Sequence, residues 1–581
     1  MTLSLRLVHA STVPKPSNCA VWTLILLFAA TVAAPAQLRI VTYNTTTADP
    51  EGGVTTARPG IDIVLESIGE EVKNGVAKPI DVLLLQEQYT MATSTQSIVD
   101  VLNGTYGTAE NPTPYARGTV NGNTSDPLAR GGRPGVVYNT LTVQLIEEIS
   151  FGVVNGSNQP RSTLRYRLRP VGYNASADFF VYNSHYKAGD SQTDQSRRQI
   201  EANSIRSHAL YGSNALGEGA HAIYAGDLNL YRSSEQAFQT LVASGAGQAF
   251  DPVNRIGSWS NNSSYADVHT QSPCVSGCLG APGGMDDRFD FQLVTGELLD
   301  GEGLSYIGGS YHAFGNNGST FNDAINDGGN TYVFSGVTSF SKSRILNALH
   351  SVTDHIPVVA DYQLPAVMQA VAGAVPATLL LGEVFDLSVT VSNAADVVAA
   401  IGADELDYSL TTSGAVSGTY LNEIDAALGD GNEHLVRLDT AMPGMKSGTV
   451  TITSTSQQVQ NGLINIPISF QVLAALAGDY NGDGEVDAAD YVLWRNTLGQ
   501  NVANYSGADG NGNGVIDAED YALWRANFGQ SASSGTLSGT LAAAESTTSA
   551  VPEPGAWLML AMGVCLTGLA GDTLRIWTRK S

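Results

Sequence analysis

The sequence predicts a multidomain, β-rich chain in which a large domain with stacked sheets is followed by an all-β sandwich and a small module of paired loops. Three observations lead to this prediction. Residues 37–363 contain short apolar runs that each carry polar residues at one end. Residues 364–475 alternate apolar and polar side chains between Gly and Asn turns. Residues 479–530 contain one motif twice, with a period of 30 residues.

The composition excludes several classes of protein. The chain has 581 residues, and its 43% hydrophobic content is too high for a wholly disordered or collagen-like chain. The 29 Lys and Arg face 55 Asp and Glu, which gives a net charge of -26. Such a chain does not bind a polyphosphate by its bulk charge, so any contact with nucleic acid needs a local site or metal ions.

The N-terminal residues have the pattern of a secretory signal peptide. Residues 1–36 contain Arg6 and Lys15, then an apolar run over residues 20–34, and end in Ala34-Pro35-Ala36. This order predicts cleavage after an Ala-x-Ala site and a mature chain that starts near Gln37. A permanent N-terminal anchor helix is the alternative.

The C-terminal residues form a second targeting segment. Residues 531–550 are rich in Ser, Gly, Thr and Ala and predict a flexible linker. In residues 551–581, a Pro-Glu-Pro motif precedes an apolar stretch over 555–570 and a basic end. This tail resembles the PEP-CTERM sorting signal of bacterial envelope proteins. The resemblance implies transient membrane anchoring, cleavage by an exosortase-type enzyme and delivery to the cell surface. A plain C-terminal anchor is the alternative.

The cysteines agree with export. Cys19 and Cys565 lie in the two terminal segments, which leaves Cys274 and Cys278 in a loop of the large domain. In an exported chain their spacing favours a small-loop disulfide. Half of a zinc site with His269 is the alternative.

Residues 364–475 carry 2 basic and 11 acidic residues in short alternating runs. Residues 385–391 and 448–453 are two such runs. Period-two patterning with regular turns predicts an immunoglobulin-like β-sandwich. No constellation of reactive side chains stands out in it, so we interpret it as a spacer or a binding module.

The duplicated motif places oxygen-bearing residues where a Ca²⁺ loop requires them. In each copy, side-chain oxygens stand at positions 1, 3, 5, 9 and 12, Gly stands at position 6, and position 7 supplies its backbone. The candidate ligands are Asp479, Asn481, Asp483, Glu485, Asp487 and Asp490 in the first copy, and Asp509, Asn511, Asn513, Val515, Asp517 and Asp520 in the second. Position 12 is expected to open the helix that follows each loop.

The paired loops over residues 476–530 resemble a type I dockerin, because each loop has a helix only after it. That resemblance implies Ca²⁺-dependent folding and docking to a cohesin-like partner. A Ca²⁺-stapled stability module without a partner is the alternative.

Residues 37–363 contain the candidate chemistry, with 20 Lys and Arg against 32 Asp and Glu. Six strand-like runs carry polar residues at one end, and in stacked sheets such ends gather around one cleft. The runs are 38–44 with Asn44, 80–87 with Glu87, 179–185 with Asn183 and His185, 222–229 with Asp227 and Asn229, 288–293 with Asp290, and 353–359 with Asp354 and His355.

Together and in this order, the six runs resemble the endonuclease/exonuclease/phosphatase superfamily, the DNase I-like fold. The resemblance implies an α/β four-layer sandwich, with two sheets packed face to face and helices outside. It also implies Mg²⁺- or Mn²⁺-assisted hydrolysis of a phosphoester. An inactive copy of the fold is the alternative. Thr353 departs conservatively from the serine that the family usually has before its Asp-His pair.

The resemblance assigns a role to each polar residue. Asn44, Glu87 and Asp354 match the family's metal ligands, and hard oxygen atoms suit a divalent cation. His355 pairs with Asp290 as general base or transition-state stabiliser. Asp227 matches the residue that orients or deprotonates the attacking water. His185 and Asn229 match the residues that hold the non-bridging phosphate oxygens. Asn183 is expected to support its strand end.

Two further features bear on the substrate. Arg165, Arg167 and Arg169 share one face of a predicted strand and, with Arg161, form the densest basic patch of the domain. This patch is a candidate grip for a nucleic-acid backbone, and a solvated strand face is the alternative. The Gly- and Asn-rich residues 306–332, within the interval 299–349, are expected to form an inserted loop over one rim of the site.

We therefore expect a secreted, surface-directed, metal-dependent phosphoesterase, and an endonuclease that hydrolyses nucleic-acid phosphodiesters is the first hypothesis. A phospholipid or sphingomyelin phosphodiesterase is the second enzyme hypothesis. A non-catalytic surface scaffold, in which the dockerin-like pair is the function, is the hypothesis from a different class.

Overall fold

The computed structural model describes residues 37–48, 53–126, 131–213, 215–217, 219–277, 279–473 and 476–531. The predicted signal peptide, the linker beyond residue 531 and the PEP-CTERM-like tail lie outside these ranges. Within them, no helix has both the length and the apolar character that a membrane span needs. The chain divides into two compact units, Met1–Ala474 and Ala475–Ser581, which are described separately.

The first sheet of the large α/β region has seven strands in the order β10-β12-β1-β2-β4-β3, with β11 also paired to β12. Their bounds are β1 Leu38–Asn44, β2 Val82–Gln88, β3 Tyr115–Arg117, β4 Arg133–Asn139, β10 Ser305–Tyr306, β11 His312–Ala313 and β12 Val358–Gln363. β1 and β2 are parallel and almost fully buried, as their continuous apolar runs predict. Their carboxyl ends therefore meet at one edge.

The second sheet has five strands in sequence order. They are β5 Val143–Phe151, β6 Thr163–Pro170, β7 Phe179–His185, β8 Ala222–Asp227 and β9 Asp290–Val294. β7 and β8 are parallel, and β8 pairs antiparallel with β9. In this register His185 stands opposite Asp227, and Asp227 stands opposite Asp290.

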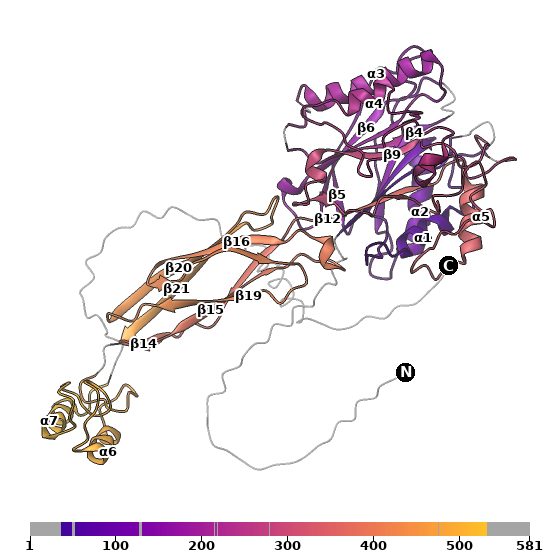
Figure 1. Cartoon of the computed structure of the whole chain (residues 1–581). Helices are drawn as coiled ribbons and strands as arrows, with labels where there is room; N and C mark the ends of the chain where they lie inside the picture. The colour runs from indigo at the N-terminus through magenta and orange to yellow at the C-terminus, as the bar shows by residue number, and fades with distance from the viewer. Residues whose placement is uncertain are drawn as a thin grey trace, which may run out of the picture. The chain divides into compact units, whose positions relative to one another are not determined.

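Helices cover the outer face of each sheet (Figure 1). α1 Ile61–Glu70, α2 Gln96–Tyr106 and α5 Lys342–Val352 share one core cluster with the first sheet. α3 Gln192–Leu210 and α4 Gln236–Leu241 share another with the second sheet. A third cluster, with apolar residues of β1, β2, β6 and β7, fills the space between the sheets. These layers confirm the predicted α/β four-layer sandwich.

Buried amide side chains join the two sheets. Gln292 donates to the carbonyls of Ile40 and Val358, each at 3.0 Å. Gln86 donates to Asn183 at 2.7 Å, and Asn183 donates to the carbonyls of Leu85 and Gly135. Each bond satisfies polar groups that burial would otherwise leave without water. Asn183 therefore supports its strand end, as the sequence predicts.

The interval between β9 and β12 differs from the inserted rim loop that its composition predicts. Its two short strands, β10 and β11, pair with β12. Phe314 and Ile325 are buried in the core cluster of α1 and α5, and Asn330 bonds the carbonyls of Gly315 and Ile325. Local composition misses this arrangement because the few apolar residues of the segment are far apart in sequence yet reach the same core.

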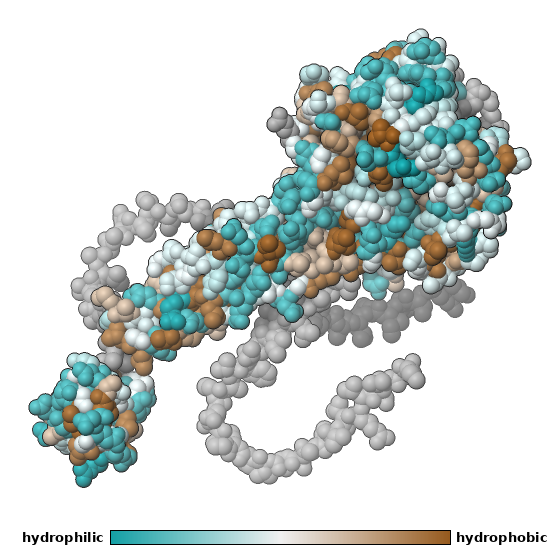
Figure 2. Space-filling view, in the orientation of Figure 1, coloured by the Kyte–Doolittle hydropathy of each residue, from teal (hydrophilic) through white to brown (hydrophobic). Residues whose placement is uncertain are grey.

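Residues 368–473 form two facing sheets around a core of their own. One has the order β13-β15-β19-β17 and the other β14-β21-β20-β16-β18, an immunoglobulin-like arrangement. The strands are β13 Met368–Ala372, β14 Thr378–Leu380, β15 Asp386–Asn393, β16 Leu406–Gly414, β17 Val416–Ser417, β18 Tyr420–Asp425, β19 Asn432–Leu438, β20 Gly444–Ser454 and β21 Leu463–Leu473. On the face seen in Figure 2, apolar side chains lie in small separate patches among polar ones.

The second unit contains α6 Ala488–Thr497 and α7 Ala518–Asn527, one after each predicted Ca²⁺ loop. The helices begin earlier than expected: Asp487 and Asp517, at loop position 9, are their N-caps, and position 12 falls in the first turn. Trp494 donates to the carbonyl of Asp517 at 2.7 Å, and Trp524 donates to that of Asp487 at 2.8 Å. Each repeat thus braces the loop of the other.

Candidate active site

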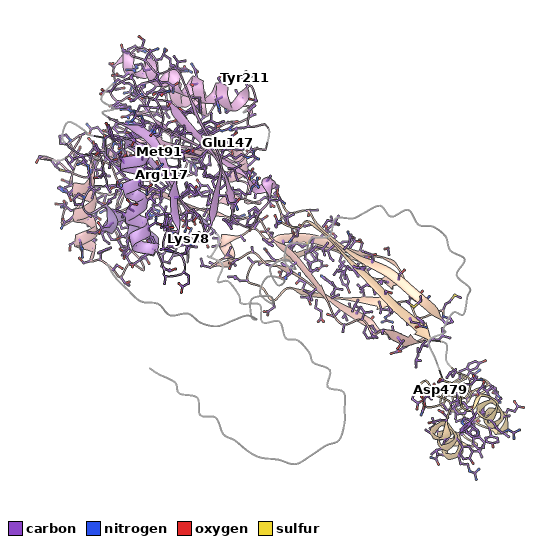
Figure 3. All side chains as sticks on the ribbon, turned by 180° about the vertical axis from the view of Figure 1, so that it is seen from behind. Lys78, Met91, Arg117, Glu147, Tyr211 and Asp479 are labelled. Carbon is purple, nitrogen blue, oxygen red and sulfur yellow. The ribbon has the colours of Figure 1, made fainter. Side chains whose placement is uncertain are left out.

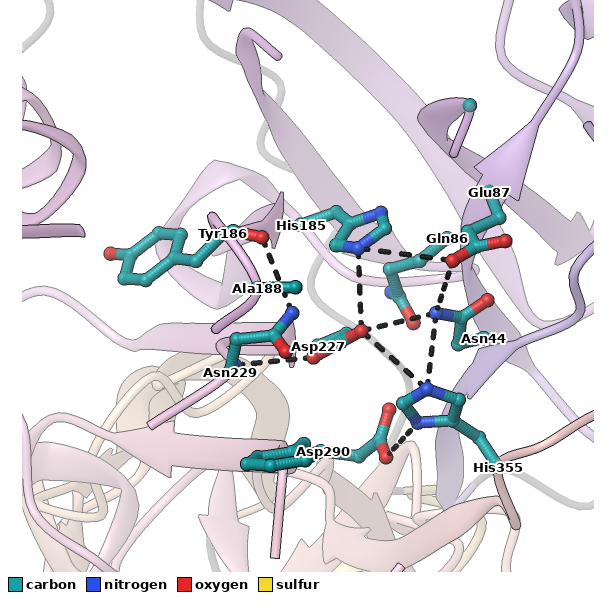
Figure 4. Close-up of polar contacts among 12 residues, drawn as sticks. Asn44, Gln86, Glu87, His185, Tyr186, Ala188, Asp227, Asn229, Asp290 and His355 are labelled. Carbon is teal, nitrogen blue, oxygen red and sulfur yellow. Dashed lines mark hydrogen bonds and ion pairs between the residues drawn. The ribbon is translucent and has the colours of Figure 1, made fainter. Parts of the chain in front are cut away.

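Figure 4 shows the predicted catalytic residues gathered at the ends of strands from both sheets. The first sheet contributes Asn44 from β1, Glu87 from β2 and His355 from the turn before β12. The second sheet contributes His185, Asp227 and Asp290 at the ends of β7, β8 and β9. These residues are up to 311 positions apart in sequence. The packing of the two sheets therefore assembles the site.

His355 and Asp290 form the central pair. The His355 Nδ1 atom lies 2.7 Å from Asp290 Oδ2, and both side chains are buried. Burial by itself lowers the pKa of His355, but the carboxylates of Asp290 and Asp227 raise it well above its ordinary value. We therefore expect an imidazolium whose Nε2 faces Asp227 Oδ2, 3.7 Å away.

Asp227 lies between the two histidines. Its Oδ2 atom is 3.3 Å from His185 Nε2 and accepts a hydrogen bond from Asn44 Nδ2 at 3.1 Å. Burial raises the pKa of Asp227, and the charge of His355 opposes this shift. Burial, with the nearby Arg161 guanidinium, lowers the pKa of His185 well below its ordinary value. His185 is thus a neutral imidazole beside a carboxyl group that readily exchanges a proton.

Glu87 is held in an unusual backbone conformation. Its φ is +56°, a left-handed value that costs a non-glycine residue free energy and is found at functional sites. A Cβ on Gly132 would lie 2.3 Å from the Glu87 carbonyl carbon, so glycine is required where the two segments cross. Asn44 Nδ2 donates to Glu87 Oε1 at 3.2 Å. The backbone therefore directs this carboxylate into the site.

Asp354 is fixed by donors from three segments. Thr46 Oγ1 donates to Oδ1 at 3.0 Å, while the backbone N–H of Ala281 and the amide of Gln271 donate to Oδ2 at 2.8 Å and 3.3 Å. The preceding Thr353 hydroxyl donates to the Asn44 carbonyl at 3.0 Å. Thr353, which directly precedes Asp354, thus links that residue to the end of β1 at Asn44.

The charges around the site fit a divalent cation. Burial and the neighbouring Asp354 raise the pKa of Glu87, which indicates that negative charge accumulates there. Among the described residues, no three His, Cys, Asp or Glu side chains converge on one point where a metal ion could be held. Mg²⁺ is commonly bound by only one or two carboxylates, with water and substrate oxygens completing its shell. Glu87 and Asp354 fit that requirement, whereas Asn44 turns its Nδ2 toward Glu87 and Asp227 and its oxygen toward the Thr46 N–H, so its amide would have to turn over to serve as a ligand.

The structure adds two residues that the strand-end pattern did not identify. The Gln271 amide lies 2.8 Å from His355 Nε2 and also reaches Asp354. The partly buried Arg161 donates to the carbonyl oxygens of His185 and Tyr186, each at 3.4 Å. Neither residue belongs to a recognisable motif, because each comes from a loop. The one available signal for Arg161 was its place in the basic patch.

The predicted basic patch is divided by the fold. Only Arg161 reaches the active site. Arg165 is 3% exposed and pairs with Glu147, which Figure 3 labels. Arg167 and Arg169 both donate to Asp178, with Nε–O distances of 2.6 Å and 2.5 Å. Two carboxylates of the chain therefore pair with three of the four guanidinium groups.

The disulfide prediction for the large domain gains support. Cys274 is disulfide-bonded, which removes it from the alternative zinc site. His269 is fully buried, with its Nε2 atom 2.9 Å from the Trp259 carbonyl oxygen. Cys278 lies outside the described residues.

The two predicted Ca²⁺ loops share one internal geometry. Asp479 accepts hydrogen bonds from the backbone of Gly482 and Gly484, and Asp509 does the same with Gly512 and Gly514. Asp490 and Asp520 each accept backbone N–H groups from the start of their loop and from position 9. The carboxylates of positions 1 and 12 are thus turned into the loop.

Comparisons with known proteins bear on the C-terminal module first. Residues 477–528 match the Dockerin type I domain model, which confirms the dockerin prediction and implies Ca²⁺ binding. No curated protein matches the sequence.

The solved structures that are similar to the chain include the following three. An endonuclease/exonuclease/phosphatase from Beutenbergia cavernae has 13% identity and a TM-score of 0.34, with 75% of this chain and 100% of that chain covered. The human Nocturnin catalytic domain with bound sulfate has 12% identity and a TM-score of 0.31, with 56% and 94% covered. Sphingomyelinase C from Streptomyces griseocarneus has 14% identity and a TM-score of 0.29, with 56% and 99% covered.

Proposed function

We propose that the chain is a divalent-metal-dependent phosphodiester hydrolase that acts on nucleic acid. The His355–Asp290 pair carries this proposal, since it holds a buried imidazolium against Asp227 beside the oxygen ligands Glu87, Asn44 and Asp354. A cation in such a position stabilises the charge that develops on a phosphoryl group. His355, whose pKa is raised by the neighbouring carboxylates, suits the role of proton donor. Asp227, whose pKa is raised by burial, suits the role of proton acceptor.

In the proposed reaction, Asp227 accepts the proton of the attacking water, because burial has made its carboxylate a stronger base. His355 donates through Nε2 to a phosphate oxygen and remains paired with Asp290. His185, Asn229 and Arg161 donate to the non-bridging oxygens. Glu87, Asn44 and Asp354 would hold Mg²⁺ or Mn²⁺, and a cation bound there would neutralise charge on the phosphoryl oxygens. The reaction breaks one P–O bond and gives a phosphomonoester and an alcohol.

A phospholipid phosphodiesterase is the second candidate, and one observation favours it. The loop that contacts Asp354 through Ala281 also carries Val275 and Leu279, which are 46% and 42% exposed. Apolar side chains at the rim suit a substrate with an acyl chain better than they suit a nucleic-acid backbone. The pairing of Arg165, Arg167 and Arg169 with acidic residues likewise removes one support for nucleic acid.

The full-length protein, with Mg²⁺ or with EDTA, should be assayed against supercoiled plasmid, bis-p-nitrophenyl phosphate and sphingomyelin vesicles. His355→Ala removes the proposed cation. His434→Ala is the matched control, because His434 is also buried and hydrogen-bonded, to Tyr408 at 2.7 Å in the β-sandwich. Mg²⁺-dependent nicking that only His355→Ala abolishes supports the nuclease. Vesicle hydrolysis without nicking selects the lipid candidate, and inactivity on all three overturns catalysis in favour of a scaffold.

We also propose that residues 1–36 export the chain, since dockerin domains are typical of extracellular proteins. We further propose that the dockerin domain, residues 477–528, binds a cohesin-like partner. Ca²⁺-dependent binding to an immobilised type I cohesin tests the second point. Loss of that binding in Asp479→Ala is the expected result, while binding to neither the wild type nor the variant would support the stability-module alternative.

A further inference from the structure

The peptide group between Tyr186 and Lys187, directly after His185, is held from two sides. Its carbonyl oxygen accepts a hydrogen bond from Asn229 Nδ2 at 3.2 Å and one from Arg161 Nη1 at 3.4 Å. Its N–H group donates to Glu201 Oε2 at 3.0 Å. The peptide dipole thus lies between a cation at its oxygen and a carboxyl group at its N–H. Both Asn229 and Arg161 belong to the proposed site.

Glu201 is an unusual residue for the interior of a helix layer. It lies on α3, is 1% exposed, and belongs to none of the motifs assigned above. The charged and titratable groups facing it are Arg161 from the loop before β6, Arg197 and Arg198 from α3, and Tyr186. Burying a carboxyl group costs free energy. Such groups, when they lie beside a cleft, are candidates for a functional role.

We propose that Glu201 is a positioning residue of the active site, which clamps the Tyr186–Lys187 peptide and thereby orients His185, Asn229 and Arg161 toward the substrate phosphate. The proposal rests on the phosphoester hydrolysis proposed above. Glu201 does not contact the substrate; it acts through the backbone that follows His185.

Arg198, also buried on α3, differs from Glu201 in the groups that it contacts. Arg198 pairs with Glu235 at 2.8 Å and donates to the carbonyls of Lys187 and Gly189. Its charge is therefore balanced by a partner on the same outer layer. Glu201 instead accepts from the Lys187 backbone N–H, and the charge of Arg161, which acts on Glu201, also acts on Glu87 and Asp227.

The test compares Glu201→Ala and Glu201→Gln in the full-length protein. Hydrolysis of bis-p-nitrophenyl phosphate with Mg²⁺ is measured from pH 6 to 9.5, and amide hydrogen exchange is measured over residues 186–189. Glu201→Ala should lower kcat by about 10- to 100-fold, the usual cost of losing a supporting contact, and should accelerate exchange at Lys187. Glu201→Gln keeps an acceptor for the Lys187 N–H and should restore both near neutral pH.

The pH profile separates positioning from packing. Glutamine cannot ionise, so the ratio of wild-type to Glu201→Gln kcat should change above about pH 8, where burial places the pKa of Glu201. Arg206→Ala is the control, because Arg206 is also buried on α3 but donates to the carbonyls of Ala243 and Ala246. It should lower thermal stability and leave kcat and the pH profile unchanged.

Unchanged kcat in a folded Glu201→Ala, or an equal loss in Arg206→Ala, overturns the proposal. If Glu201→Ala does not fold, the pH profile of Glu201→Gln is the test. A profile identical to that of the wild type overturns the proposal, and a different profile above pH 8 supports it. Faster exchange at Lys187 in Glu201→Ala, when the wild-type protein itself has no phosphoesterase activity, would show that the proposed function, and not the clamp, has failed.

Discussion

The active-site cluster and the paired Ca²⁺ loops both gather carboxylates and amides, but they do so over different distances along the chain. In each loop the ligands lie within one short segment, and its glycines and backbone N–H groups turn them inward. In the active site, Asn44, Asp227 and His355 come from opposite sheets and meet through strands far apart in sequence. A local site survives as long as its segment folds, whereas a distributed site depends on the packing of the whole domain.

The distributed site can be tested by a substitution that changes a candidate metal ligand and leaves the fold unchanged. Glu87→Gln should lower Mg²⁺-supported hydrolysis by at least about 100-fold, because it removes a hard anionic ligand of the cation. Thermal unfolding should be nearly unchanged, since the amide keeps the volume of the side chain. The Mg²⁺ dependence of kcat is the measurement, and unaltered metal dependence would refute the assignment of Glu87.

Arg161 tests whether the site extends beyond the strand ends. Arg161→Ala should reduce kcat/KM by about 10- to 1,000-fold, the range expected when a donor to the developing phosphate charge is lost. Arg133→Ala is a matched control, because Arg133 is also a partly buried arginine that donates to a backbone carbonyl, that of Tyr89. Equal losses in both variants would contradict a specific role for Arg161.

The local site should fail independently of the distributed one. Asp490→Ala removes the carboxylate that accepts the Tyr480 and Asp487 backbone N–H groups, and should weaken Ca²⁺ binding by about 10- to 100-fold. Because Trp494 and Trp524 brace the opposite loops, tryptophan fluorescence during Ca²⁺ titration reports the loss. Phosphodiester hydrolysis should remain at the wild-type level, and a parallel loss of hydrolysis would show that the two sites are coupled.

The buried carboxyl group of Glu201 predicts a pH-dependent stability. Burial raises its pKa from 4.5 to about 8. Between these values the folded chain binds more protons than the unfolded chain, so the free energy of unfolding falls as the pH rises through this window. Glu201→Gln lacks this contribution, and its melting temperature relative to that of the wild type should therefore rise from pH 5 to pH 8.5. Parallel melting curves across this range would contradict the shift.

The smallest expected effect concerns the paired arginines. The double variant Arg167→Ala, Arg169→Ala should change plasmid nicking and its salt dependence by less than about threefold, because both side chains are already held by the Asp178 carboxylate. A marked fall in nicking together with a shallower salt dependence would instead restore them as phosphate contacts.

Much of this protein is determined by local sequence. The apolar runs specified β1, β2, β7, β8 and β9 almost to the residue, because a buried strand must be continuously apolar. The repeated loop motif specified the dockerin module, because all of its candidate Ca²⁺ ligands lie within one segment. The polar residues at the strand ends also indicated which side chains the two sheets bring together.

Only the tertiary structure decided which other residues serve the site. Gln271 and Arg161 contact site residues from two loops, Glu201 contacts the Lys187 backbone from an outer helix, and no local pattern marks such contacts. The same holds for Arg165, Arg167 and Arg169, which pair with two carboxylates from other segments of the chain. Local sequence determines which face of an element is apolar, but the partner of a polar side chain depends on packing between elements that are distant along the chain.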